Sequence, residues 1–236
     1  MLSIWKRELQ GYFHTSIGYV FMAVFLFLCS ILFYMQILQQ RSSDLLTFIG
    51  LMSYFWMLLS PVLTMRLLAG ERVRKTDQLL LTSPVSLPGI VLGKYLAAVS
   101  VLLLTVAMTL FFVLIIAVYG AVYPGELMVG YLGFILEGCA FLAMDLYLSG
   151  RTRGTVSAAL LAFGANFLVW LLDLLVDAVP IGTFSDLLSF FSLYGRNEPF
   201  LMGQLSFASI GFDLTFTAAF LALTIHHLDM ARCRGV

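Results

Sequence analysis

The chain has 236 residues, of which 61% are hydrophobic and only 11% are charged, and its formal net charge is zero. A soluble domain is about half apolar and about a quarter charged. The composition therefore excludes an ordinary water-soluble protein, and the balanced charge gives no sign of a nucleic-acid partner.

The apolar residues fall in long, continuous blocks rich in Leu, Phe and Val, without the alternation of membrane barrel strands. Because a helix satisfies its backbone hydrogen bonds within one segment, such blocks predict membrane-spanning helices. We predict an all-α integral membrane protein with a single transmembrane domain over residues 1–236. In chain order, the six expected spans are approximately Gly18–Leu38, Phe48–Leu68, Tyr95–Val118, Leu127–Leu148, Thr155–Val176 and Phe207–Ile225.

Before the first span, residues 1–15 predict an amphipathic helix that lies in the cytoplasmic interface. At helical spacing, one face combines Leu2, Trp5, Leu9, Tyr12 and Phe13, and another combines Lys6, Gln10 and His14. Trp and Tyr favour the headgroup level of a bilayer. A plain charged N-terminal flank is the alternative interpretation.

Residues 69–87, between the second and third spans, form the most polar stretch of the chain. Thr76 can cap a short helix, with Asp77 in its first turn, and Pro84 can end it. The residues that this helix would expose beside the charges are Leu79, Leu80 and Leu81. Exposed leucines on a charged loop are typical of a docking surface. A helix lying flat on the membrane is the alternative.

Acidic residues occur inside the later spans, where a carboxyl group is costly and is by default a functional hypothesis. Glu137 lies near the middle of the fourth span, Asp145 near its inner end, and Asp213 in the outer half of the sixth. We expect Glu137 to face a polar cavity. These groups could serve a proton-coupled secondary carrier. Alternatively, they face the bundle interior and accept hydrogen bonds from Ser, Thr or Tyr.

Residues 180–206, before the last span, have intermediate polarity. The apolar run Thr183–Tyr194 is too short to cross a bilayer. Residues Gly195–Pro199 are expected to break it, and Phe200–Leu205 is apolar again. The pattern predicts a re-entrant hairpin of two short helices dipping into the outer leaflet. A simple extracellular loop is the alternative.

The basic residues set the expected orientation. All but two of the 13 Lys and Arg residues fall on the side of the N-terminus, the exceptions being Arg41 and Arg196. The positive-inside rule then places both termini in the cytoplasm of a multi-pass protein of the cell membrane. Lys94, at the start of the third span, is expected to extend its amine to the cytoplasmic interface.

Enzyme signatures are not found. Residues Gly89–Tyr95 have one residue too few between the glycines for a phosphate-binding loop, and Tyr95 replaces the Ser or Thr that would hold magnesium. His226 and His227 are adjacent on a helix and point about 100° apart, so they would not easily share a metal. We predict no catalytic residue, cofactor site or metal site.

The inner loop and the entry to the third span carry a family resemblance. Glu71-Arg72, Thr76, Leu79-Leu80 and Ser83-Pro84-Val85 are followed by Val91-Leu92-Gly93-Lys94-Tyr95. This order resembles the E-R-x-x-G-T-x-E-x-L-L-x-x-P-V loop and V-L-G-K-Y/F entry of ABC-2-type transporter permeases, especially the short six-span members similar to gliding-motility and nitrous-oxide-reductase-maturation permeases. The chain departs from that pattern in having Lys75 in place of Gly and Asp77-Gln78 near the usual Thr-x-Glu.

The resemblance implies the transmembrane subunit of an ATP-driven exporter. Such permeases form dimers of like or unlike chains, sit in lipid, and bind a separate cytoplasmic ATPase that holds the ATP and magnesium. The resemblance assigns two groups of residues to contact with that ATPase. They are the elbow residues Trp5, Lys6, Arg7, Glu8 and Leu9, and the loop residues Glu71, Arg72, Thr76, Asp77, Leu79, Leu80, Leu81 and Pro84. The transported substrate stays open, since lipid, peptide, drug and glycan exporters share this architecture.

Overall fold

A computed structural model describes residues 1–73, 86–120, 122–178 and 192–233. The described helices are α1 (Leu2–His14), α2 (Ile17–Phe33) with the π-helical turn η1 (Tyr34–Leu38), α3 (Leu45–Thr64), α4 (Ala69–Val73), α6 (Leu87–Tyr119), α7 (Pro124–Arg151), α8 (Thr155–Ala178), α10 (Leu193–Leu201) and α11 (Phe207–Cys233). Six of the described segments are long and apolar enough to cross a membrane. The prediction of an all-α, six-span membrane protein is therefore confirmed.

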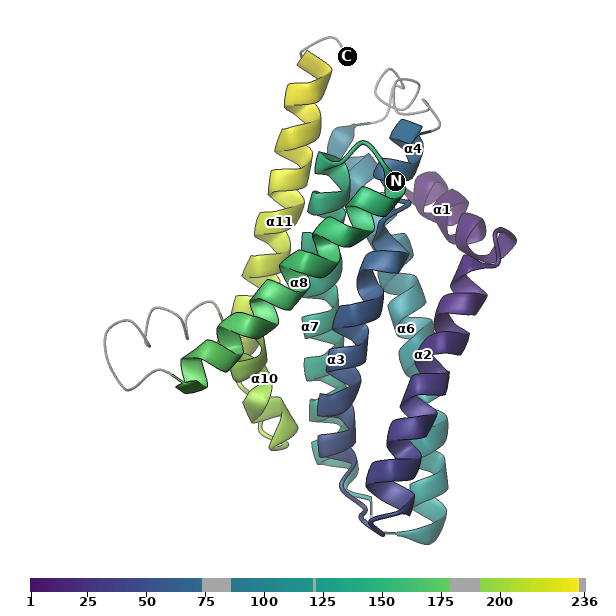
Figure 1. Cartoon of the computed structure of the whole chain (residues 1–236), viewed down its shortest axis with the longest axis vertical. Helices are drawn as coiled ribbons and strands as arrows, with labels where there is room; N and C mark the ends of the chain where they lie inside the picture. Colours follow the sequence, from purple (N-terminus) through teal and green to yellow (C-terminus); the bar gives the residue numbers. More distant parts are fainter. Residues whose placement is uncertain (74–85, 121, 179–191, 234–236) are drawn as a thin grey trace.

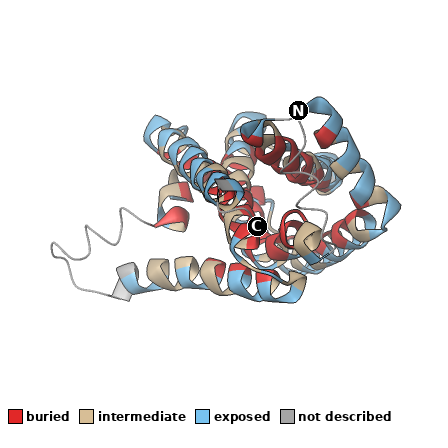
Figure 2. Ribbon diagram, turned by 90° about the horizontal axis from the view of Figure 1, so that it is seen from above, coloured by how far each residue is buried: buried red, intermediate tan, exposed pale blue. Residues whose placement is uncertain are grey.

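Helix α7 is the centre of the bundle. It packs most extensively against α11 and α3, and it also contacts α8, α10 and α6. Helix α8 crosses the bundle obliquely, while α1 folds back beside α2 and α6 at one end (Figure 1). We call that end, which also holds α4 and the end of α11, the inner end. The distribution of basic residues predicts that this end faces the cytoplasm. Seen along the bundle, buried residues line the facing sides of the helices and exposed residues their outer sides (Figure 2).

Small residues on α7 let its neighbours approach closely, as is common where helices pack in a membrane. A Cβ added to Gly133 would lie 2.6 Å from Phe200 Cβ, and one added to Gly138 would lie 3.0 Å from Leu102 Cδ2. Between these glycines and α2, the rings of Phe25, Trp56 and Phe134 pack with centroids 5.8–6.4 Å apart. This part of the core is thus held by shape and aromatic contact.

Helix α1 is separated from α2 by a sharp turn at Ser16, whose φ of 57° is left-handed. The turn lays α1 against the first part of α6. A Cβ added to Gly93 would lie 3.0 Å from Ile4 Cγ2 and 3.2 Å from the Met1 carbonyl oxygen. The glycine of the Val-Leu-Gly-Lys sequence is therefore required by the close approach of the elbow.

Two predictions about local structure are wrong. Helix α10 runs through Gly195–Pro199, which was expected to break the chain, and it ends at Leu201, so Phe200–Leu205 forms no helix of its own. Asn197 and Phe200 are both buried, and this packing outweighs the poor helix propensity of Gly and Pro. The Lys94 side chain is fully buried between α1, α4 and α6 and does not extend its amine into water. Most of Thr183–Tyr194 lies outside the described residues.

Candidate functional site

Four charged side chains from three helices meet at the inner end. The Lys94 amine on α6 lies 3.0 Å from Glu8 Oε1 on α1 and 2.7 Å from Glu71 Oε1 on α4. The Arg7 guanidinium lies 2.8 Å from Glu8 Oε1 and 3.3 Å from Glu71 Oε1. We call Arg7, Glu8, Glu71 and Lys94 the inner ion cluster.

Burial makes this cluster a structural joint. The Lys94 side chain has 0% exposure, and Glu8 and Glu71 have 19% and 16%, whereas Arg7 is 58% exposed. A buried charge is tolerated only when it is paired. Burial raises the pKa of Glu8, but the cations of Lys94 and Arg7 outweigh it and hold that pKa below its usual value. Two positive and two negative groups therefore balance within one small volume.

Two further hydrogen bonds fasten α1. The Trp5 indole Nε1 donates to Ser100 Oγ on α6 at 2.9 Å, and the Tyr12 hydroxyl donates to the Leu63 carbonyl at the end of α3 at 2.7 Å. Leu9 packs partly buried against the core, while Lys6 is exposed. Most of the elbow residues singled out from the sequence thus face the protein.

Helix α4 is bonded on its other side to the connection between α7 and α8. The Arg72 guanidinium donates to the Thr152 carbonyl at 3.2 Å, and the Ala69 amide donates to Ser149 Oγ at 3.2 Å. Glu71 faces α1 and α6 through the ion cluster. Helix α4 therefore joins the elbow to the α7–α8 turn. The other predicted coupling residues lie outside the described part of the chain: Thr76, Asp77, Leu79, Leu80, Leu81 and Pro84.

A cavity of about 690 Å³ opens between α3, α7, α8 and α10, well away from the ion cluster. We call it the α10 cavity. Glu137 contributes to its wall and is 3% exposed. Glu137 Oε2 accepts hydrogen bonds from Ser53 Oγ at 2.9 Å and from Asn197 Nδ2. Both donors are neutral.

Helix α10 is held over this cavity by α8 and α7. Asp173 Oδ1 on α8 accepts from Ser192 Oγ, and Ser192 Oγ in turn accepts from the Gly195 amide at 3.0 Å. A carboxylate near a helix N-terminus also interacts favourably with the helix dipole. At the other end of α10, the fully buried Phe200 ring fills the space over Gly133.

A second buried carboxyl group lies nearer the inner end. Asp145 Oδ2 accepts from Ser60 Oγ at 2.6 Å and from Asn166 Nδ2 at 3.5 Å. Asn166 Nδ2 also donates to the Met57 carbonyl at 3.0 Å. Pro61 has no N–H for that carbonyl four residues earlier, so the amide of Asn166 replaces the missing helical donor.

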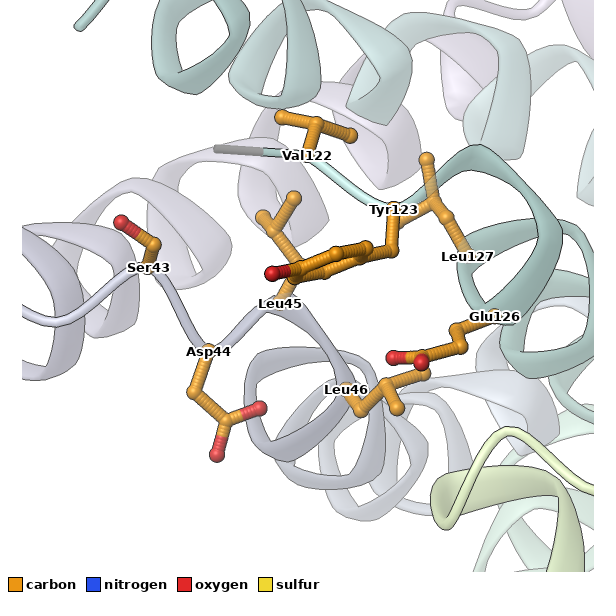
Figure 3. Close-up of a pocket in the computed structure, with 8 residues that line it drawn as sticks. All are labelled: Ser43, Asp44, Leu45, Leu46, Val122, Tyr123, Glu126 and Leu127. Carbon is orange, nitrogen blue, oxygen red and sulfur yellow. The ribbon is translucent and has the colours of Figure 1, made fainter. Parts of the chain in front are cut away.

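Another pocket lies at the outer ends of α3 and α7 (Figure 3). Its volume is about 340 Å³. The Asp44 carboxylate points away from it and caps α3, accepting from the Thr47 amide at 3.1 Å and the Thr47 hydroxyl at 2.6 Å. Tyr123 and Glu126 form the opposite wall (Figure 3). Because Asp44 caps α3, the rest of the described lining of this pocket is largely apolar. Its described residues do not form a cluster of polar groups.

A comparison with protein families matches residues 22–225 to the model of the ABC-2 family transporter protein. The chain belongs to the ABC-2 transporter family. The match covers all six candidate spans in whole or in large part. No curated protein matches the chain. The family makes this protein the membrane subunit, or permease, of an ABC-type transporter.

Within this ABC-2 permease, the acidic residues that the sequence singled out have different bonded neighbours. Glu137 lies at the α10 cavity and Asp145 in the Ser60–Asn166 network. Asp213 is buried on α11, next to Phe212, and the Arg196 guanidinium of α10 lies 4.3 Å from the centre of the Phe212 ring. Asp145 thus lies in a setting of its own, whereas Asp213 is close enough to Glu137 and to Arg196 for electrostatic interaction.

Sequence reasoning missed the partners of these acids. Ser53, Asn166 and Asn197 each donate to a buried carboxyl group. The available signal was an Asn inside an otherwise apolar span, because an amide in hydrocarbon needs a partner. Lys94 was recognised from the sequence as an interfacial lysine and as part of a family motif, without its partners. Its pairing with Glu8 and Glu71 joins residues too far apart in the chain for their contact to be predicted.

Proposed function

We propose that this permease belongs to an exporter driven by ATP that a separate cytoplasmic ATPase hydrolyses. The ATPase contacts the elbow α1 and the loop 74–85, and the working unit contains a second permease chain. The single observation that carries the proposal is the inner ion cluster. It ties the elbow to the helices on both sides of the loop, because Glu71 lies on α4 before the loop and Lys94 lies about two turns into α6 after it.

The cluster offers a physical route for force. A displacement of the loop moves α4 and the start of α6, between which it runs. Because the Lys94 amine is bonded to both Glu8 and Glu71, α1 follows that displacement. The bonds from α4 to Thr152 and Ser149 carry the same displacement to the turn between α7 and α8. Separation of these buried charges is strongly disfavoured, so the parts move together.

Co-purification tests the proposal. Tagged chain is recovered from detergent-solubilised native membranes, comparing wild type with the double variant Leu79→Asp/Leu80→Asp. We expect an ATP-binding subunit with wild type and at least a tenfold loss with the variant, since two charges replace leucines of the predicted docking surface. Mass spectrometry and ATP hydrolysis by the eluate provide the measurement.

The matched control is Gln39→Asp/Gln40→Asp, which adds two charges to exposed positions at the opposite end of the bundle. It is expected to retain the subunit. If wild type brings down no ATP-binding subunit, the proposal fails. The alternative is then a proton-coupled carrier, which the position of Glu137 on the α10 cavity favours. Loss of proton-driven transport in Glu137→Gln would support that alternative.

A further inference from the structure

The α10 cavity has an unfilled set of hydrogen-bond acceptors. Among the residues that the structure describes, no donor reaches Glu137 Oε1 or Asn197 Oδ1, and the Tyr194 hydroxyl has no partner. All three residues belong to the cavity wall, and Glu137 and Asn197 are only 3% and 5% exposed. Buried polar atoms are nearly always bonded, so these atoms call for a ligand.

We propose that the α10 cavity binds an organic ammonium group, with the carboxylate of Glu137 as its counter-ion. A primary ammonium group offers three N–H donors and no acceptor. Glu137 Oε1, Asn197 Oδ1 and the Tyr194 hydroxyl oxygen are each able to accept such a donor. An anionic group would face the same oxygens and be repelled.

The charge of the wall agrees with a cationic ligand. The described wall contains three carboxylates, Glu137, Asp173 and Glu198, and one cation, Arg196. The Arg196 guanidinium is turned onto the ring of Phe212 on α11, with which it makes a cation–π contact. Asp173 is engaged by Ser192 at the start of α10. Glu137 is a buried carboxyl group of this wall whose Oε2 is bonded only by the neutral donors Ser53 and Asn197. Its Oε1 has no donor among the described residues.

Aromatic rings complete the site. Tyr54, Tyr194 and Trp170 all contribute to the wall, and the rings of Tyr54 and Tyr194 are stacked with centroids 5.1 Å apart. Aromatic faces attract cations and pack against an apolar body. The volume of about 690 Å³ is in the range of small-molecule sites. The site thus suits an amine attached to an apolar or aromatic group.

The ammonium group could be carried by a soluble amine or by a lipid headgroup such as phosphatidylethanolamine. The binding site itself rests on the geometry above. That its ligand is the transported substrate rests on the proposed function. Amine binding is measured without ATP and without an ATPase. A failure to bind amine would therefore contradict the binding site, whereas a failed co-purification would contradict the proposed function.

The test uses full-length protein in phosphatidylcholine nanodiscs, whose headgroup has no N–H donor. Benzylamine is the soluble probe, and benzyltrimethylammonium is its matched cation without N–H groups. Quenching of Trp170 fluorescence, isolated by subtracting the Trp170→Phe variant, reports occupancy. We expect saturable binding of benzylamine at least about tenfold tighter than that of benzyltrimethylammonium, because only the former can donate. In a second arm, native mass spectrometry compares phosphatidylethanolamine with phosphatidylcholine retained by the protein from mixed nanodiscs.

Variants assign the effect to the site. Glu137→Gln is expected to weaken benzylamine, or to release phosphatidylethanolamine, by about tenfold or more. Glu126→Gln, the same change on the same helix at the outer pocket, is expected to have no effect. Tyr194→Phe removes a hydroxyl that has no partner among the described residues, so it is expected to leave folding intact. It should weaken the binding of benzylamine several-fold and leave the binding of benzyltrimethylammonium unchanged.

Preference for benzylamine shows that a soluble amine is the ligand, and retention of phosphatidylethanolamine shows that a lipid headgroup is. The proposal is overturned if wild type neither binds benzylamine nor retains phosphatidylethanolamine in preference to phosphatidylcholine. It is also overturned if the trimethyl cation binds as tightly as benzylamine, or if Glu137→Gln and Tyr194→Phe both bind like wild type.

Discussion

The inner ion cluster and the α10 cavity both contain buried carboxyl groups, but they satisfy them in opposite ways. Glu8 and Glu71 are each bonded to a lysine and an arginine that the same chain supplies. Glu137 is bonded by a hydroxyl and an amide, and its second oxygen has no donor among the described residues. The first arrangement holds three helices together, whereas the second leaves room for a group from outside. Buried carboxyl groups of one membrane protein can thus serve fastening or binding, and the two are distinguished by their bonded partners together with a neighbouring cavity.

The largest expected effect comes from breaking the fully paired side of this comparison. Lys94→Met keeps the length of the side chain but leaves Glu8 and Glu71 buried without its amine. We expect a loss of roughly 3 kcal/mol in the free energy of unfolding, since removal of one partner of a buried pair leaves an uncompensated charge. Thermal unfolding of the purified protein in detergent measures it. Lys6→Met, at an exposed position of α1, is the control and should leave the unfolding temperature unchanged. Equal stability of the two variants would contradict the role of the cluster as a joint.

A smaller effect is expected at the wall of the α10 cavity. In Gly133→Ala, the new methyl group would meet Cβ and ring atoms of Phe200 at 2.6–2.9 Å, and Phe200 is fully buried. Overpacking of this kind costs about 1–3 kcal/mol, and it should displace α10 and weaken amine binding. Thermal unfolding measures the loss of stability, and quenching of Trp170 fluorescence measures the loss of amine binding. Gly164→Ala on α8, where a Cβ would meet nothing within 4 Å, is the control. Unchanged amine binding in Gly133→Ala would show that Phe200 does not position α10.

The smallest expected effect sharpens the comparison at Asp145, a carboxyl group that is bonded by neutral donors and does not line the α10 cavity. Asn166→Ala removes the donor to the Met57 carbonyl and to Asp145, at a cost of about 1 kcal/mol. In a Pro61→Ala background the helix regains its own donor to Met57, so the same change should cost less. A double-mutant cycle of unfolding free energies measures this coupling. Additive costs would show that Asn166 does not compensate for Pro61.

The spans could be predicted because the thickness of a bilayer fixes the length of an apolar helix. The elbow could be predicted because its polar and apolar residues separate at helical spacing. Structure that depends on contacts between distant residues could not. Helix α10 forms through Gly195 and Pro199 because Asn197 and Phe200 pack into the bundle, and local propensity carries no trace of that packing. Lys94 was expected at the interface because its partners on α1 and α4 are brought to it only by the fold.

The candidate sites show the same division. Glu137 could be singled out from the sequence alone, since an acid in the middle of an apolar span is rare in hydrocarbon. Whether that acid is paired depends on α10, which is 60 residues later in the chain. Asn166 could be noticed as an amide in a span, but its pairing with a carbonyl freed by Pro61 requires the relative placement of α3 and α8.

The position of the ion cluster along the chain also bears on the order of events during synthesis. Glu8 is made 86 residues before Lys94, and Trp5 is made 95 residues before Ser100. The elbow therefore leaves the ribosome long before its bonding partners exist, and it must wait at the membrane surface until the third span has been inserted. Docking of the first helix is consequently completed only after the third of the six spans has been made.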